Sequence, residues 1–347
     1  MAGLSRAVPA AARRWAAVWG NGMFGRLGHG SQDGEEEPRR VLHGALGERD
    51  LDVKQVACGG AHTAFVTGDG GVYTCGLNDH GQLGLGMEVE WTEAPTQVDI
   101  PEPVAAVAAG HFHTVCLTES GHIWSFGRNH RGQLGLGASL AGKQAVPEPM
   151  LVGGFGGAEL SQVVAGMDHT MVVTTAGDLL AWGCNDNGRL GHGDESSFKM
   201  FSSSDEPAPR IVRSLRGVRV ASAAAGHMHS GCVDDQGRVY LWGYGKYWQL
   251  ASGHDRDLDT PHEVEGLHAV AQLSAGGLHT AALTRSGQLF TWGLDTAGEL
   301  GTGGPGGSTH NGRYPGPVDA PRLASVSCGW KHTAAVTSEG RLLAWGW

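Results

Sequence analysis

The sequence lacks several features that would assign it to a common functional class. Only five of its 25 basic residues are lysine and its formal net charge is −10, so it offers little of the clustered positive charge that binds phosphates. It contains no run of 18 apolar residues that could cross a membrane and no Asn-x-Ser/Thr sequon. We therefore expect no membrane span and no direct binding of nucleic acid.

Signatures of catalysis and metal binding are missing as well. There is no Gly-x-Ser-x-Gly elbow, no His-Glu-x-x-His pair and no phosphate loop ending in Gly-Lys-Ser/Thr. The six cysteines include no Cys-x-x-Cys and stand in strand-like runs, which is typical of small buried residues in a reduced compartment. These absences predict a protein that is not an enzyme and has no cofactor, metal site or disulfide.

Glycine, in contrast, is abundant, with 58 of 347 residues against a usual share of about 7%. It does not occupy every third position, which excludes collagen. Because glycine costs roughly 1 kcal/mol inside a helix, this composition favours short strands joined by many turns. Hydrophobic residues make up 40% of the chain, which is enough to form a buried core.

A repeat accounts for much of the glycine. Histidine followed by Thr or Ser recurs six times, at intervals of 50 to 60 residues. Glycines keep fixed places three residues before each histidine, eight after it and fourteen after it. The repeated histidines are His62, His113, His169, His229, His279 and His332. Periods near 50 residues are typical of propellers. Since the six histidines share one slot, we interpret them as packed, hydrogen-bonded structural residues.

One unit shows how the repeat is expected to fold. Residues 53–57 are followed by a β-rich run at 62–67, the turn pair Asp69-Gly70 and a return strand at 72–75. Glycine in the turn supplies a positive φ without steric cost. Because one small sheet cannot bury both of its faces, the copies must pack face to face, and a ring of blades achieves this with only short edges.

The combined motifs identify a family. The third glycine follows Trp182, Trp242, Trp292 or Trp345 in four copies, and Gly-x-Leu-Gly, such as Gly81-Gln82-Leu83-Gly84, comes shortly after it in most. No Trp-Asp dipeptide indicates a WD40 repeat. The pattern Gly-x-x-His-Thr, Trp-Gly and Gly-Gln-Leu-Gly resembles the RCC1 (regulator of chromosome condensation) repeat from about Trp15 to Trp347. The resemblance implies an all-β fold, a seven-bladed β-propeller.

The domain organisation follows from the motif positions. Residues 1–14 are expected to be a disordered start or a transit peptide, because the first 32 residues hold arginines but no Asp or Glu. Residues 15–347 are expected to form the propeller, with six complete repeats and a partial seventh. The approximate repeats are 15–67, 68–118, 119–174, 175–234, 235–284, 285–337 and, in part, 338–347.

Closure of the ring leaves two alternatives. The N-terminal and C-terminal pieces both supply a Trp-Gly strand, and neither completes the other. Either the ring closes with six and a part blades, or the natural chain is longer. The second alternative is favoured, because a ring that lacks most of a blade exposes apolar sheet faces.

Candidate binding residues occupy the two variable positions between the repeated glycine and histidine. These turns should cluster at one end of a propeller, and binding residues favour loops on rigid scaffolds. The predicted partner-binding residues are His111, Phe112, Met167, Asp168, His227, Met228, Trp330 and Lys331. Their apolar members would form a patch that suits a protein partner; alternatively, these residues merely cap the core. A second polar set, which includes His80 and Arg128, follows the Trp-Gly motifs and suits either turn structure or binding.

Three functions are compatible with the resemblance. The first is a scaffold that recruits protein or ribonucleoprotein partners, and the arginine-containing start is similar to a mitochondrial subgroup that includes RNA-processing proteins; cytoplasm and nucleus are alternative locations. The second is guanine-nucleotide exchange on a small GTPase, although no lysine-rich tail of the nuclear type is present. The third, ultraviolet-B sensing, is disfavoured. The family's receptor uses several Gly-Trp-Arg-His-Thr copies, and only residues 329–333 come close to that motif here.

Overall fold

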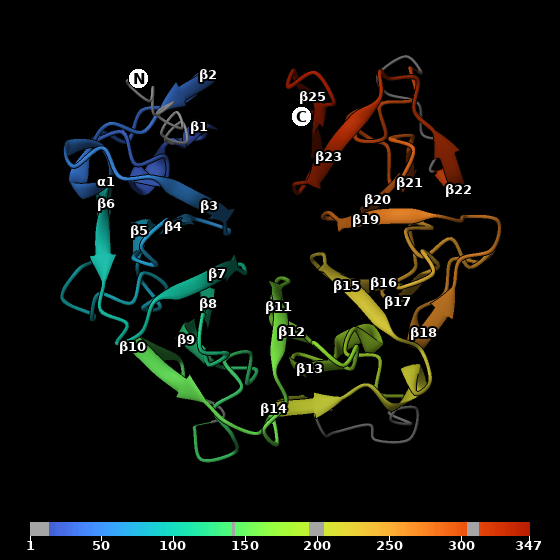
Figure 1. Cartoon of the computed structure of the whole chain (residues 1–347), viewed down its shortest axis with the longest axis horizontal. Helices are drawn as coiled ribbons and strands as arrows, with labels where there is room; N and C mark the ends of the chain where they lie inside the picture. Colours follow the sequence, from blue (N-terminus) through green and yellow to red (C-terminus); the bar gives the residue numbers. More distant parts are fainter. Residues whose placement is uncertain (1–13, 141–142, 194–204, 304–311) are drawn as a thin grey trace, which may run out of the picture.

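The computed structural model describes residues 14–140, 143–193, 205–303 and 312–347. The predicted disordered start or transit peptide therefore lies outside the described residues, apart from Arg14. Regular structure in the described part of the chain is almost entirely β-strand, arranged as small sheets around a central axis (Figure 1). The first strands are β1 (Ala17–Gly20), β2 (Glu35–Arg40), β3 (Val53–Cys58), β4 (His62–Thr67), β5 (Val72–Leu77) and β6 (Trp91–Val98), with helix α1 (Gly44–Glu48) between β2 and β3.

The remaining strands follow the same pattern to the end of the chain. They are β7 (Val104–Ala109), β8 (His113–Thr118), β9 (Ile123–Arg128), β10 (Ala145–Val152), β11 (Leu160–Ala165), β12 (His169–Thr174), β13 (Leu179–Gly183), β14 (Glu206–Ile211), β15 (Val220–Ala225), β16 (His229–Asp234), β17 (Val239–Gly243), β18 (Leu258–Glu263), β19 (Val270–Ala275), β20 (His279–Thr284), β21 (Leu289–Gly293), β22 (Gly312–Pro317), β23 (Leu323–Cys328), β24 (His332–Thr337) and β25 (Leu342–Gly346).

The strands form antiparallel sheets whose members follow one another in chain order. Five sheets have four strands each, namely β3–β6, β7–β10, β11–β14, β15–β18 and β19–β22; β23–β25 form a three-stranded sheet, and β1 pairs with β2. The first strand of each of the six larger sheets lies nearest the axis (Figure 1). The prediction of an all-β propeller is confirmed.

The sheets are offset from the repeats in the sequence. Residues 68–118, for example, contribute β5 and β6 to one sheet and β7 and β8 to the next. Within a sheet the predicted hairpin is present, since β4 pairs with β5 across a turn in which Gly70 has a φ of +83°. The chain thus links each sheet covalently to the next in the middle of a repeat.

The two ends of the chain contribute to different sheets. Strand β1 pairs with β2, and β25 pairs with β24, so the two Trp-Gly strands stay apart as expected (Figure 1). Within the described ranges, β1 has no strand on its inner side. None of the helices described there is both long and apolar enough to span a membrane.

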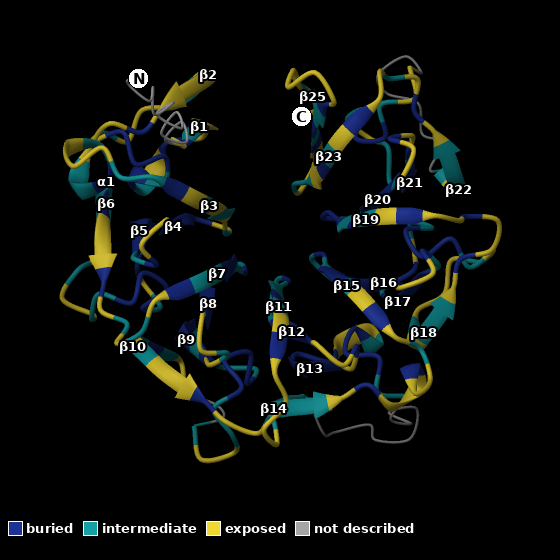
Figure 2. Cartoon of the chain, in the orientation of Figure 1, coloured by how far each residue is buried: buried dark blue, intermediate teal, exposed yellow. Residues whose placement is uncertain are grey.

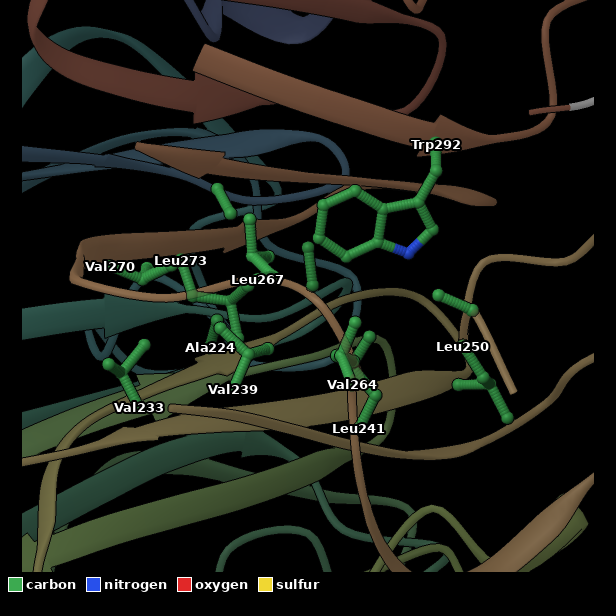
Figure 3. Close-up of a cluster of buried hydrophobic side chains, with 13 residues drawn as sticks. Ala224, Val233, Val239, Leu241, Leu250, Val264, Leu267, Val270, Leu273 and Trp292 are labelled. Carbon is green, nitrogen blue, oxygen red and sulfur yellow. The ribbon is translucent and has the colours of Figure 1, made fainter. Parts of the chain in front are cut away.

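The core lies between neighbouring sheets. Trp292 of β21 is fully buried and packs with Leu273 of its own sheet against Val239 and Leu241 of the preceding sheet (Figure 3). Equivalent clusters lie between the other sheets and contain the fully buried Trp182 and Trp242. The outermost strands, by contrast, are largely exposed or half-buried (Figure 2). Each sheet therefore buries both faces only because it has neighbours.

A single backbone carbonyl explains why three motifs recur together. The Gln133 oxygen, from a Gly-x-Leu-Gly segment, accepts hydrogen bonds from the Thr170 hydroxyl at 2.8 Å and the Trp182 indole at 3.0 Å, both in the next sheet. A Cβ on Gly135 would lie 2.7 Å from the Trp182 Nε1, so this position must be glycine. The Thr, the Trp and the Gly-x-Leu-Gly motif are therefore parts of one contact between sheets.

The repeated histidines form a second contact between sheets. Their Nε2 atoms lie 2.8–3.0 Å from the hydroxyl of the Thr or Ser that follows the next histidine. The five pairs are His62–Thr114, His113–Thr170, His169–Ser230, His229–Thr280 and His279–Thr333. In each pair the hydroxyl donates its own proton to a backbone oxygen, as Thr170 does to Gln133 O, so Nε2 must be the donor to the hydroxyl. The structural interpretation is confirmed for these five, whereas His332 is exposed.

Burial keeps these imidazoles neutral. It lowers the pKa of His62 and His229 to about 3 and that of His113 and His279 to about 4. The pKa of His169 also lies well below the usual value for the same reason. At pH 7 the five histidines therefore act as neutral hydrogen-bond donors and have no charge to offer a ligand.

Candidate functional site

The turns between the first and second strands of the six larger sheets surround the mouth of a pocket at the axis. The pocket has a cavity volume of about 150 Å³ and is lined mainly by glycine and alanine from these turns. A Cβ on Gly166 would lie 2.5 Å from the Gly226 oxygen of the next turn and 2.1 Å from the His169 ring, which explains the fixed glycine. Backbone bonds such as His227 N–H to Gly276 O, at 3.1 Å, link one turn to the next.

Five rings form a continuous array across this mouth. Centroid distances are 5.0 Å from His80 to Phe112, 4.1 Å from Phe112 to His111, 5.8 Å from His111 to His227 and 5.2 Å from His227 to Trp330. The last pair is stacked, with an interplanar angle of 25°. We call these five residues the ring array, and the end of the propeller that carries them the axial face.

Glycines in neighbouring turns make room for the array. A Cβ on Gly60 would lie 1.9 Å from the His111 ring, and a Cβ on Gly277 would lie 2.4 Å from the Trp330 ring. Both glycines occupy the first variable position of the sheet that precedes the ring-bearing turn. Each ring therefore leans over a neighbour that has no side chain, and Trp330 still leaves 61% of its surface exposed.

The structure places the predicted site residues at the axial face in different roles. His111, Phe112, His227 and Trp330 join the ring array, and Met167 lines the axial pocket beside it. The Asp168 carboxylate accepts a hydrogen bond from the Gln133 amide at 2.9 Å.

The other two predicted residues contribute less to the array. Met228 is half-buried, and its backbone oxygen accepts a hydrogen bond from the Tyr244 N–H at 3.0 Å. The Lys331 ammonium lies 5.8 Å from the Trp347 ring centroid. The predicted patch thus centres on imidazole rings, with Phe112 and Trp330 at either side of His111 and His227.

His80 of the ring array and Arg128 beside it belong to the second polar set, which the sequence left open between turn structure and binding. His80 packs edge-on against Phe112, and the Arg128 guanidinium lies 5.5 Å from the Phe112 centroid. Their neighbours in the polar set serve the turns instead, since the Asn78 carboxamide accepts the Leu83 N–H at 2.9 Å. The contacts of His80 and Arg128 with Phe112 show that the turns after the Trp-Gly strands reach the Gly-x-x-His turns.

Burial also sets the charge of the array. It lowers the pKa of His227 to about 4 and brings the pKa of His111 below its usual value, although the nearby Asp168 carboxylate opposes both shifts. Two guanidinium groups of the chain donate to carbonyls of the same turns, Arg26 to Gly60 O at 3.2 Å and Arg189 to His227 O at 3.4 Å. The His227 imidazole is therefore uncharged at pH 7, and arginine side chains of the chain already bind two carbonyls of these turns.

One group among the described residues has the geometry of a metal site, and an arginine occupies it. Cys184, Asp186 and Asp205 lie close enough to share an ion. The Arg131 guanidinium bonds Asp186 at 2.7 and 3.0 Å and also binds Asp205, which lowers the pKa of Asp186. Burial raises the pKa of the Cys184 thiol to about 12, so it is protonated at pH 7. The cluster is best described as an ion pair that joins two sheets.

Comparison with known proteins agrees with the repeat motifs and the ring of sheets. A family model described as the RCC1-like domain matches residues 16–347. The chain belongs to the RCC1-like domain family. The ultraviolet-B receptor UVR8 of Arabidopsis thaliana is 35% identical to it over 99% of this chain and 76% of UVR8. The mitochondrial RCC1 domain-containing protein RUG3 of the same plant is 34% identical over 75% of this chain and 58% of RUG3.

Other relatives carry the RCC1-like domain in very different contexts. The human E3 ubiquitin-protein ligase HERC2 is 32% identical over 72% of this chain, which amounts to 5% of HERC2. Human WBSCR16 is similar in structure, with a TM-score of 0.79 and 28% identity over 92% of this chain and 80% of its own. Prp20p of Saccharomyces cerevisiae has a TM-score of 0.83 at 22% identity over 97% of this chain and 82% of its own, which shows the shared fold.

Proposed function

We propose that this RCC1-like domain is a scaffold that binds a protein partner through the axial face, acting by recruitment rather than by catalysis. The observation that supports this most is Trp330, which leaves 61% of its surface exposed while its ring is held against His227. Tryptophans on rigid surfaces are enriched among residues that dominate binding energy, and aromatic residues are enriched at protein interfaces. The ring of backbone bonds beneath the array supplies that rigidity.

The proposed location is the mitochondrion. RUG3, at 34% identity, is named as a mitochondrial protein, and the first 32 residues of this chain hold arginines without any Asp or Glu. Ultraviolet-B sensing is not proposed, although UVR8 is 35% identical. The first variable positions of the six turns hold a single tryptophan, and its stacking partner is His227, so a coupled tryptophan cluster has no counterpart here.

The scaffold proposal predicts that partners depend on the axial face. The amount of each specific partner recovered in quantitative pull-down mass spectrometry should fall at least tenfold for the Phe112→Ala/Trp330→Ala double variant. The reason is that the variant removes both aromatic flanks of the array. Tyr314→Ala is the matched control, since Tyr314 is 63% exposed on the outermost strand β22. A partner list unchanged in the double variant would overturn the assignment of the axial face.

Guanine-nucleotide exchange is the alternative to be tested beside it. Prp20p, which shares the fold, is described with its binding properties to Gsp1p and histones. We expect the purified chain at micromolar concentration to leave GDP release from small GTPases unchanged. Acceleration of that release would make the domain an exchange factor and replace recruitment as its mechanism.

A further inference from the structure

Three residues with metal-ligating side chains line one side of the axial pocket. His111, Met167 and His227 hold the same position of the repeat, directly after its glycine, in the consecutive sheets β7–β10, β11–β14 and β15–β18. In the sheets that flank these three the position is glycine, at Gly60 and Gly277, and both also line the pocket. A pocket of about 150 Å³, lined mainly by glycine and alanine, thus has two imidazoles and one thioether grouped in neighbouring turns.

The spacing of the two imidazoles fits two ligands of one ion. The His111 and His227 ring centroids lie 5.8 Å apart. A ring nitrogen about 2.0 Å from a metal ion places its ring centroid about 3.2 Å from that ion, so two imidazoles on one ion have centroids roughly 5–6 Å apart. The Met167 turn lies next to that of His111, since the His111 N–H donates to Met167 O at 3.1 Å. A thioether from this turn would therefore be the third ligand.

The nitrogens of these two rings are not used by the protein. A Cβ on Gly60 would lie 1.9 Å from the His111 Cδ2, so this side of the ring faces Gly60. The Nδ1 on the opposite side is buried and has no hydrogen-bond partner among the described residues. The repeated histidines bond through Nε2, whereas neither His111 nor His227 uses a ring nitrogen in a hydrogen bond to the described part of the chain. Polar atoms in such a pocket need a partner, which is either water or a ligand.

The donor atoms and the surrounding charges favour monovalent copper. Thioether sulfur selects Cu(I), and imidazole also binds copper, whereas Zn²⁺ sites use thiolate, imidazole and carboxylate. Two guanidinium groups lie at the site, since Arg189 donates to His227 O at 3.4 Å and Arg128 lies 5.5 Å from the Phe112 centroid. Their repulsion of a bound ion is proportional to its charge, so it is half as large for Cu(I) as for a divalent ion. The Asp168 carboxylate, which favours the protonated form of both imidazoles, offsets part of this repulsion.

We propose that the axial pocket binds one Cu(I) ion through a ring nitrogen of His111, the thioether of Met167 and a ring nitrogen of His227. The sequence predicts no metal site because metal motifs are recognised by short spacings, and these three ligands come from three repeats, 56 and 60 residues apart. The site is distinct from partner binding, because it depends on the side chains in the pocket and does not require Trp330.

Titration of the whole chain with Cu(I) tests the site. The protein competes for Cu(I) with the chromogenic chelator bicinchoninate in the absence of oxygen, and the absorbance of the chelator complex gives the affinity. We expect one Cu(I) per chain and an affinity at least tenfold lower for His111→Ala and for His227→Ala. The control His268→Ala removes an exposed histidine and should bind as the unchanged protein does. Circular dichroism checks that each variant is folded.

Met167→Leu tests the sulfur ligand, because leucine has a similar size and no donor atom. Copper X-ray absorption should show two nitrogen neighbours and one sulfur neighbour in the unchanged protein and no sulfur in this variant, whose affinity should be at least fivefold lower. Cys58 and Cys328 also line the pocket, and Cys58→Ser/Cys328→Ser should keep the site. Loss of copper in the cysteine variant with retention in the histidine variants would overturn the proposal. Failure to compete with bicinchoninate, or a Zn²⁺ affinity equal to that for Cu(I), would overturn it as well.

Discussion

Replacing Trp182 by alanine is expected to destabilise the protein by about 3–5 kcal/mol, as for other large buried aromatic residues. The side chain is fully buried between sheets β7–β10 and β11–β14, and its indole donates to the Gln133 oxygen at 3.0 Å. The substitution leaves a large cavity at this contact and removes one of the two donors to that carbonyl. Urea unfolding followed by circular dichroism measures the loss.

Trp345→Ala is the matched control for this prediction. Trp345 makes the same hydrogen bond, to Glu299 O at 3.0 Å, but it lies on β25 and is half-buried. Its replacement should cost about half as much, because less apolar surface leaves a buried site. Equal losses for Trp182→Ala and Trp345→Ala would show that packing between complete sheets is not the main source of stability.

His169→Ala is expected to destabilise the protein by about 3 kcal/mol, because it removes a buried ring and the donor to the Ser230 hydroxyl. The His169 Nε2 lies 2.8 Å from that hydroxyl, and the side chain is fully buried. The control His332→Ala removes the same type of side chain from the exposed end of the series and should cost less than about 1 kcal/mol. A loss at His332 as large as at His169 would contradict the role assigned to the bond between sheets.

The same histidines set the dependence of stability on pH. Burial lowers the folded-state pKa of His62 and His229 to about 3 and that of His113 and His279 to about 4, and it brings the pKa of His169 well below the value of 6.5 expected when unfolded. Below pH 6.5 the unfolded chain therefore binds more protons than the folded protein. Their contribution is therefore present above pH 6.5 and is lost as the pH falls towards 4. His169→Ala should reduce the slope of stability against pH by up to about 1.4 kcal/mol per pH unit. An unchanged slope would mean that His169 is already solvated in the folded protein.

Much of the fold could be predicted from the sequence because its constraints repeat. The glycine before each histidine, the His-Thr pair and the Trp-Gly strand each recur at one position of the repeat. A residue type that recurs at one position in several copies indicates a contact that neighbouring sheets share. The motifs did not reveal that they share one hydrogen-bond acceptor. The Gln133 oxygen accepts hydrogen bonds from Thr170 and Trp182 of another sheet, a contact that no sequence spacing indicates.

The candidate site was predictable in its location and only partly in its composition. Aligning the turns placed His111 and Trp330 at one end of the ring, where the structure has them. The array itself depends on how far each side chain reaches over its neighbour, which is decided by Gly60 and Gly277 in adjacent sheets. The first variable positions, compared from one turn to the next, show a glycine in the turn that precedes His111 and in the turn that precedes Trp330.

Some contacts between sheets could not be predicted from the sequence, because only every second repeat contains the residue that makes them. The Gln162 carboxamide donates to Ala223 O at 3.3 Å and accepts from Ala223 N–H at 2.8 Å, which links it to the innermost strand of the next sheet. Gln55 and Gln272 make the same pair of bonds, whereas the sheets between them carry a small residue at this position. A pattern present in every second repeat does not stand out against repeats aligned one by one.

Site-specific photo-cross-linking tests the role of the axial face most directly. A benzophenone amino acid is placed at position 330 in one protein and at position 314 in another, because the two native side chains are similarly exposed, at 61% and 63%. After irradiation in cells, cross-linked partners are identified by mass spectrometry. Partner binding at the axial face predicts discrete cross-linked proteins from position 330 that are absent from position 314. The same products from both positions, or products from position 314 alone, would contradict it.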